Sequence, residues 1–190
     1  ELPAQVDVAI VGGGFTGLQA AYNLARKGVR VTLIEAHRFG DGASGRNGGQ
    51  LGTGQRAEAE ELEAELGYER AKALFDLAEN AKRHVQDFAD AQNLDIEYVP
   101  GQLNVSHKAS FEKDFRDHVE IAATRFGYPH MTYMDRAETE ERVGSKRFFF
   151  GIRDTGTGHI HPMKLLVGIA RAAKAAGASL HEKTPALKIE

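Results

Sequence analysis

Three glycines near the N-terminus have the spacing of a phosphate-binding turn. Gly12, Gly14 and Gly17 lie between an apolar run and a segment with helical periodicity. Glycine at these positions permits a tight turn, lets the backbone approach a pyrophosphate and allows a helix to pack closely on a strand. The first turn of such a helix offers unpaired N–H groups to the anion. The pattern therefore predicts a dinucleotide-binding site.

An acidic residue completes the pattern. Glu35 ends the second apolar run, Arg-Val-Thr-Leu-Ile-Glu. A carboxylate at this place accepts hydrogen bonds from the ribose hydroxyls and repels a 2′-phosphate, which argues against NADP. FAD and NAD share the ADP group, so the turn and Glu35 leave both cofactors open.

A second glycine-rich segment, residues 42–52, follows a few residues later and reads Gly-Ala-Ser-Gly-Arg-Asn-Gly-Gly-Gln-Leu-Gly. A flat isoalloxazine ring held against the backbone favours glycine and short polar side chains, whereas a nicotinamide enzyme has no such requirement. We interpret the segment as continuing along FAD. A mobile surface loop is the alternative.

Hydrophobic periodicity predicts the elements that must position these residues. The pattern is a βαβ unit followed by mixed helices and strands. We expect a turn at Pro100-Gly101. We also expect the acidic residues of 58–65 to be solvated on the outer face of their helix. We expect strands at 6–11, 30–35, 96–99, 102–107, 131–134, 147–153, 178–182 and 186–190, and helices at 15–27, 56–66, 68–92, 111–126, 136–142 and 162–176.

Composition excludes several classes of protein and site. The 190 residues have a formal net charge of -3 and no cysteine. Nucleic acid and anionic membranes are therefore not favoured as partners, and disulfides, thiolate metal sites and a cysteine-linked flavin are excluded. No metal site is expected, because His159 and His161 have no third ligand nearby in the sequence. We expect a cytoplasmic protein, and the ends at Glu1 and Glu190 suggest a piece of a longer one.

Three stretches resemble a known family: Val-Ala-Ile-Val-Gly-Gly-Gly-Phe-Thr-Gly-Leu, Leu-Ile-Glu-Ala and Gly-Ala-Ser-Gly-Arg-Asn-Gly-Gly-Gln. They are similar to the FAD-dependent oxidoreductases of the D-amino acid oxidase and glycine/sarcosine oxidase (DAO) type, and most similar to the gamma-glutamylputrescine oxidase branch. The segment His-Ile-His-Pro at 159–162 also resembles that branch.

The resemblance implies an α/β fold, with a Rossmann-like FAD-binding domain of the GR2 type and part of an inserted α+β substrate domain. The FAD-binding domain would comprise residues 1–94 and 153–190, and residues 95–152 would begin the substrate domain. Family members are longer than this chain. Their later half supplies most of the substrate pocket, a further strand of the FAD sheet and another contact to the flavin.

The resemblance also implies which residues bind FAD. Those at the pyrophosphate would be Gly12, Gly14, Phe15, Thr16 and Gly17, with Glu35 at the ribose and Ala36, His37 and Arg38 nearby. Those along the ribityl chain and flavin would be Ser44, Arg46, Asn47, Gly48, Gly49, Gln50 and Leu51, and Ala186 would meet adenine through its backbone. Some relatives carry a flavin-linking histidine where Arg46 stands here, so we expect non-covalent FAD.

The chemistry that the resemblance implies is oxidation of a small amine or amino acid by hydride transfer to the flavin, followed by hydrolysis of the imine. His159 and His161 are the candidate catalytic side chains, and a structural role is the favoured alternative for each. An NAD-dependent dehydrogenase and a non-catalytic FAD-binding subunit or fragment are the competing functions. These 190 residues alone are expected to be inactive.

Overall fold

A computed structural model describes residues 2–189 and contains two compact units. Unit 1 comprises the described residues up to Gly49, residues 87–97 and those from Ile160 onward, and unit 2 comprises residues 50–86 and 98–159. Residues 50–86 therefore pack with residues 98–159 in one compact unit. The functional division expected at 94/95 and 152/153 stays a prediction.

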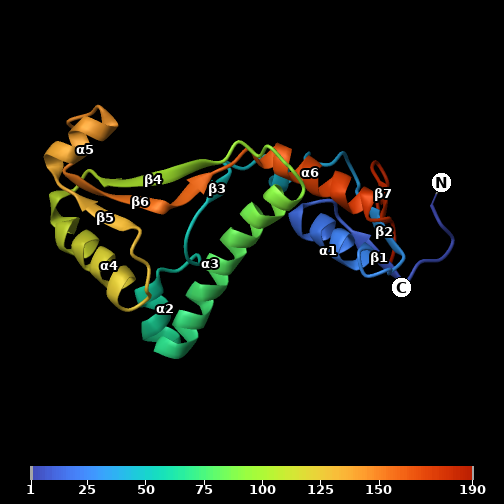
Figure 1. Ribbon diagram of the computed structural model, residues 1–190, viewed down its shortest axis with the longest axis horizontal. Helices are drawn as coiled ribbons and strands as arrows, with labels where there is room; N and C mark the ends of the chain where they lie inside the picture. Colours follow the sequence, from blue (N-terminus) through green and yellow to red (C-terminus); the bar gives the residue numbers. More distant parts are fainter. Residues whose placement is uncertain (1, 190) are drawn as a thin grey trace. The chain divides into compact units, whose positions relative to one another are not determined.

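Unit 1 is built around a parallel sheet (Figure 1). Its strands β1 (Val8–Val11), β2 (Val31–Ile34) and β7 (Ser179–His181) pair in the order β1-β2-β7. Helix α1 (Phe15–Ala25) connects β1 to β2, and α6 (Pro162–Ala175) precedes β7 and lies beside α1. This arrangement is the Rossmann-like βαβ unit that the sequence predicts.

The helices of unit 1 form because their apolar residues recur on one face. Leu18, Ala21 and Tyr22 of α1 are buried, as are Leu166 and Ile169 of α6. A three- or four-residue step places such side chains on one side of a helix, where they pack against the neighbouring elements. Burying these faces holds the end of β1 and the start of α1 in fixed geometry.

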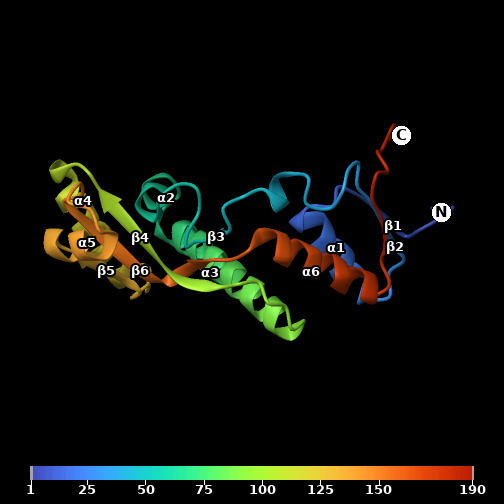
Figure 2. The same cartoon turned by 90° about the horizontal axis from the view of Figure 1, so that it is seen from above.

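Unit 2 contains an antiparallel sheet whose central strand is β6 (Phe150–His159) (Figure 2). One neighbour of β6 is β4 (Val99–Ser106), and the others are β3 (Gln50–Leu51) and β5 (Met131–Met134). The remaining helical elements are η1 (Ala43–Gly45) in unit 1, α2 (Ala59–Leu66), η2 (Ala109–Phe111), α4 (Glu112–Thr124) and α5 (Arg136–Val143) in unit 2, and α3 (Tyr68–Ala91), which begins in unit 2 and ends in unit 1.

Aromatic side chains form the core of unit 2. Phe75 of α3 packs on Phe126, with ring centroids 5.2 Å apart, and meets Tyr128 edge-on at 5.8 Å. Ala71 and Ala122 complete this buried cluster, and Met131 of β5 packs against it. The cluster joins helices that lie far apart in the sequence.

Two expectations about strands are wrong. The sequence predicts a turn at Pro100-Gly101, but β4 runs through both residues with an irregular register between Pro100 and Gln102. Proline is tolerated there because β4 is an edge strand. The strand expected at 186–190 is also not formed: residues 186–189 are irregular, and residue 190 lies outside the described part.

Candidate functional site

The glycine turn lies between β1 and α1, in the position that the sequence predicts. Gly14 has extended backbone angles (φ −80°, ψ −178°), and α1 begins at the next residue. A Cβ atom added at Gly17 would lie 2.0 Å from the carbonyl oxygen of Gly12. Only glycine therefore allows α1 to approach the turn this closely.

Glu35 lies beside this turn. Its Oε2 accepts a hydrogen bond from the backbone N–H of Gly13 at 2.7 Å, and its Oε1 accepts one from that of His37 at 2.9 Å. The Gly13 N–H, and after it the His37 N–H, hold the pKa of the Glu35 carboxyl below its ordinary value. The contact between Gly13 and Glu35 is not evident from the sequence motif, which uses the other glycines.

Ser44 also reaches the turn. Its Oγ accepts a hydrogen bond from the backbone N–H of Phe15 at 3.2 Å, and a Cβ added at Gly14 would lie 2.9 Å from the same oxygen. The hydroxyl therefore lies at the N-terminal end of α1. The structure brings Ser44 to the residues predicted for the pyrophosphate, although the resemblance implies a place along the ribityl chain.

Asn47 stabilises the glycine-rich segment itself. Its Nδ2 donates to the carbonyl oxygens of Ala43 and Ser44, at 3.1 and 3.0 Å, and its Oδ1 accepts from the N–H of Gly49 at 2.9 Å. The side chains of Arg46 and Asn47 are exposed, as is Gly48. The loop is therefore held by its own hydrogen bonds.

The segment after β7 is tied to the end of β2. The N–H of Thr184 donates to the carbonyl oxygen of Glu35 and the N–H of Lys183 donates to that of His37, both at 2.8 Å. Ala186 follows two residues later and is exposed, as are Ala36 and Arg38. The predicted adenine and ribose residues thus share one stretch of the surface of unit 1.

The remaining predicted residues lie elsewhere. Gln50 and Leu51 form β3 of unit 2, where Gln50 pairs with His159, an exposed residue at the end of β6. His161 belongs to unit 1 and caps α6, because its Nδ1 accepts a hydrogen bond from the N–H of Lys164 at 3.4 Å. The structure thus gives His161 a structural contact.

A buried chain of hydrogen bonds in unit 2 is absent from the sequence-based expectations. Lys82, 8% exposed, donates to Thr53 Oγ1 at 2.8 Å, Thr53 donates to the Tyr128 hydroxyl at 2.8 Å, and Tyr128 donates to Asp154 Oδ1 at 2.8 Å. Glu79 accepts a further hydrogen bond from Lys82 at 2.9 Å. Burial is the main reason why the pKa of Tyr128 lies above its ordinary value.

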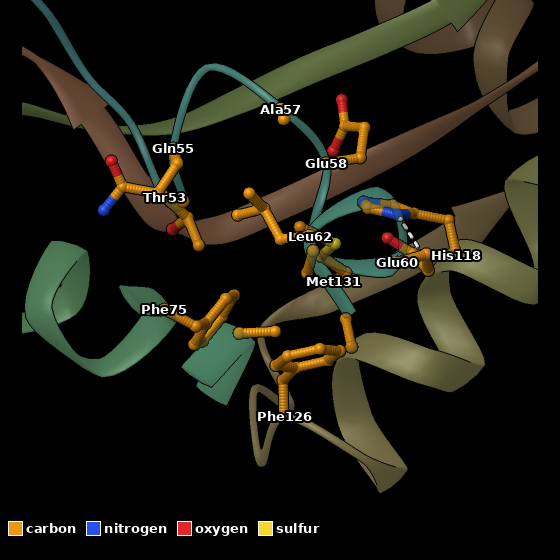
Figure 3. Close-up of a pocket in the computed structure, with 14 residues that line it drawn as sticks. Thr53, Gln55, Ala57, Glu58, Glu60, Leu62, Phe75, His118, Phe126 and Met131 are labelled. Carbon is orange, nitrogen blue, oxygen red and sulfur yellow. Dashed lines mark hydrogen bonds and ion pairs between the residues drawn. The ribbon is translucent and has the colours of Figure 1, made fainter. Parts of the chain in front are cut away.

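Two members of the acidic segment are not simply solvated, so that expectation is wrong for Glu60, which pairs with His118, and for Glu63, which pairs with Arg125. Oε1 of Glu60 lies 2.9 Å from Nδ1 of His118, and Oε2 is buried with no hydrogen-bond partner among the described residues. Figure 3 shows this pair at the edge of a cavity of about 100 Å³, with Glu58 nearby and Phe75 and Phe126 across it. The partners are distant in sequence, so no local motif could reveal them.

The fold and the turn together define a class of protein. A carboxylate held beside a glycine turn at the start of a helix fits the ribose and pyrophosphate of an ADP group. The chain belongs to the FAD dependent oxidoreductase (DAO) family, whose model matches residues 7–190. The cofactor of this family is FAD, which decides against the NAD alternative.

Two curated proteins of this kind are similar to the chain over nearly its whole length. The chain is 66% identical over 186 residues to "Probable oxidoreductase OrdL" of Rhizobium meliloti, covering 98% of this chain and 44% of that protein. It is 32% identical over 184 residues to "Gamma-glutamylputrescine oxidoreductase" of Escherichia coli, covering 97% of this chain and 43% of that protein. The chain thus spans less than half the length of these curated relatives.

A solved structure gives the same result for the fold. Glycine oxidase from Geobacillus kaustophilus superposes with a TM-score of 0.77 at 25% sequence identity, over 97% of this chain and 48% of that one. None of the described helices combines the length and apolar character needed to cross a bilayer.

Proposed function

We propose that this chain is the FAD-binding part of an oxidoreductase that oxidises the carbon–nitrogen bond of a small amine or amino acid. The supporting observation is the 2.7 Å hydrogen bond between the Gly13 N–H and the Glu35 carboxylate, which joins the phosphate turn to the ribose position. Two relatives, a gamma-glutamylputrescine oxidoreductase and a glycine oxidase, support the substrate class.

Each part of the nucleotide site has a distinct role in this proposal. The start of α1, with Gly14, Phe15, Thr16 and Gly17, binds the pyrophosphate through backbone N–H groups. Glu35 binds the ribose, and the backbone near Ala186 meets adenine. The segment from Arg46 to Leu51 binds the ribityl chain and the ring without a covalent bond.

Bound FAD would supply the redox chemistry, accepting a hydride from the carbon next to the substrate nitrogen. Water then hydrolyses the imine to a carbonyl compound and an amine or ammonia. The residues of this chain need to bind the cofactor and exclude other orientations of it. No proton-transfer step is assigned to His159 or His161.

The test is an absorption spectrum of the protein expressed from its complete gene. We expect bound flavin that is bleached anaerobically by at least one compound in a panel of amines and amino acids. A colourless protein that gains no flavin absorbance with added FAD contradicts the cofactor site. Bound flavin that no compound bleaches supports a non-catalytic FAD-binding subunit instead.

A further inference from the structure

An aromatic side chain fills the space beside the middle residue of the glycine turn. Gly13 is buried, and a Cβ added there would lie 2.4 Å from both Cδ1 and Cε1 of Phe39. The edge of the Phe39 ring therefore lies directly against the backbone of the turn. Gly13 does not have a positive φ, so this contact, and not the backbone conformation, is what requires glycine at the position.

The backbone of Phe39 is held by a distant part of the chain. Glu182 directly follows β7, and its Oε1 accepts a hydrogen bond from the Phe39 N–H at 2.7 Å. The two residues are 143 positions apart, and both belong to unit 1. Phe39 lies in the loop after β2, where no helix or strand fixes its backbone. Glu182 therefore fixes the point from which the ring reaches Gly13.

The segment that carries Glu182 is itself constrained. Lys183 has a left-handed backbone with φ 52°, which is uncommon for a residue other than glycine. The N–H of Lys183 donates to the carbonyl oxygen of His37 at 2.8 Å. The N–H of Thr184 donates to that of Glu35, also at 2.8 Å. A strained conformation persists only where the surrounding contacts determine it, so residues 182–184 have a fixed place beside the loop after β2.

Gly13 is thus fixed on two sides by residues that follow β2. Its N–H donates to Oε2 of Glu35 at 2.7 Å, and the Phe39 ring occupies the space where a side chain would begin. The N–H groups proposed to bind the pyrophosphate begin at Gly14, the next residue, so any shift of Gly13 moves them. Binding groups must keep their positions to within about 0.5 Å to remain effective. Both contacts therefore preorganise the turn.

We infer that Phe39 and Glu182 are positioning residues for FAD. The ring of Phe39 sets the place of the turn, and the carboxylate of Glu182 holds Phe39, without either side chain contacting the cofactor. The inference rests on the proposed nucleotide site and deepens it. It adds two residues outside the glycine motif to those that determine the affinity for FAD.

The first test is a cycle of variants at Gly13 and Phe39. The measurement is the dissociation constant of FAD for folded apoprotein prepared from the complete protein. Gly13→Ala should raise this constant roughly tenfold where Phe39 is present, because the added Cβ meets the ring. In the Phe39→Ala background the same change should raise it less than about threefold, because the space is then free. Phe39→Leu replaces Phe39→Ala in the cycle if that variant does not fold.

The second test concerns the hydrogen bond from Phe39 to Glu182. Glu182→Ala should raise the dissociation constant of FAD roughly three- to tenfold. Glu182→Gln keeps an oxygen that can accept the Phe39 N–H, so it should restore most of the affinity. Asp90→Ala is the control, because Asp90 is an exposed acidic residue of the same unit. Melting temperatures verify that each apoprotein is folded, and a loss of stability alone leaves the dissociation constant of folded protein unchanged.

The outcomes separate the inference from the proposed site. A smaller effect of Gly13→Ala in the Phe39→Ala background, together with rescue by Glu182→Gln, supports the inference. Additive effects of Gly13→Ala and Phe39→Ala overturn the role of Phe39, and normal affinity in Glu182→Ala overturns that of Glu182. Either result leaves the nucleotide site standing if Glu35→Ala weakens FAD binding. An unmodified protein that binds no FAD overturns the proposed site and the inference together.

Discussion

The backbone N–H of Gly13 lies 2.7 Å from Oε2 of Glu35, so the glycine turn is hydrogen-bonded directly to the carboxylate that follows β2. The same carboxylate holds the N–H of His37, which begins the loop toward Ser44. Glu35 therefore orders the turn, and in the proposed site the same carboxylate also binds the ribose. This double role leads to the first prediction.

Glu35→Ala should weaken FAD binding by about 1–3 kcal/mol, because charge-assisted hydrogen bonds are lost. The measurement is the dissociation constant of FAD for apoprotein prepared from the complete protein. Asp90→Asn is the control, since Asp90 is an exposed acidic residue of the same unit. Unchanged affinity in Glu35→Ala would remove Glu35 from the ribose site.

Gly17→Ala should disrupt the turn, because the added Cβ would lie 2.0 Å from the carbonyl oxygen of Gly12. Backbone atoms cannot move aside as a flexible side chain does, so α1 must shift away from the pyrophosphate position. We expect FAD content after purification to fall at least as far as in Glu35→Ala. Asn23→Ala is the control, because Asn23 lies on the exposed face of the same helix. Normal flavin content in Gly17→Ala would contradict the close approach.

Tyr128→Phe should lower the stability of unit 2. The hydroxyl of Tyr128 joins Thr53 to the buried Asp154, and its removal leaves both without that partner. The expected loss is about 1–3 kcal/mol, observed as a lower melting temperature. In Tyr133→Phe the lost hydroxyl contacts the exposed Glu112, so the melting temperature should change little. Equal changes of melting temperature in the two variants would show that the buried hydrogen bonds of Tyr128 stabilise the unit no more than the exposed one of Tyr133.

The pair of Glu60 and His118 should make stability depend on pH. The hydrogen bond between them is the main reason why the pKa of Glu60 lies below its ordinary value of 4.5 and that of His118 above its ordinary value of 6.5. The stabilisation is therefore fully present between pH 4.5 and 6.5. It is lost as pH rises through the folded-state pKa of His118 or falls through that of Glu60.

His118→Gln tests this dependence through melting temperatures measured across that pH range. The difference from the unmodified protein should be largest between the two ordinary pKa values and should shrink above and below them, with a maximum of about 1 kcal/mol. The exposed His107 offers a control, since His107→Gln should give no such profile. A constant difference at all pH values would show that the pair acts through packing and not through charge.

Local sequence determined the βαβ unit and its turn. The spacing of Gly12, Gly14 and Gly17 and the apolar runs on either side depend on contacts within a few residues, so they could be predicted. The cap of α5 by Asp135, which accepts the N–H of Glu138 at 2.9 Å, is equally local. The approach of Ser44 to Phe15 could not be predicted, since it depends on how the intervening loop folds back.

The sequence by itself determined that the chain carries a βαβ unit with a glycine turn and an acidic residue after its second strand, because strand, turn and helix signals are short-range. Only the tertiary structure decided which side chains meet across the sheet and helices of unit 2. There the hydrogen bonds that link Lys82 to Asp154, and the pair of Glu60 and His118, join residues separated by dozens of positions. The packing of Phe75 against Phe126 joins α3 to the segment that follows α4, and hydrophobic burial of this kind is non-directional, so no local pattern encodes it.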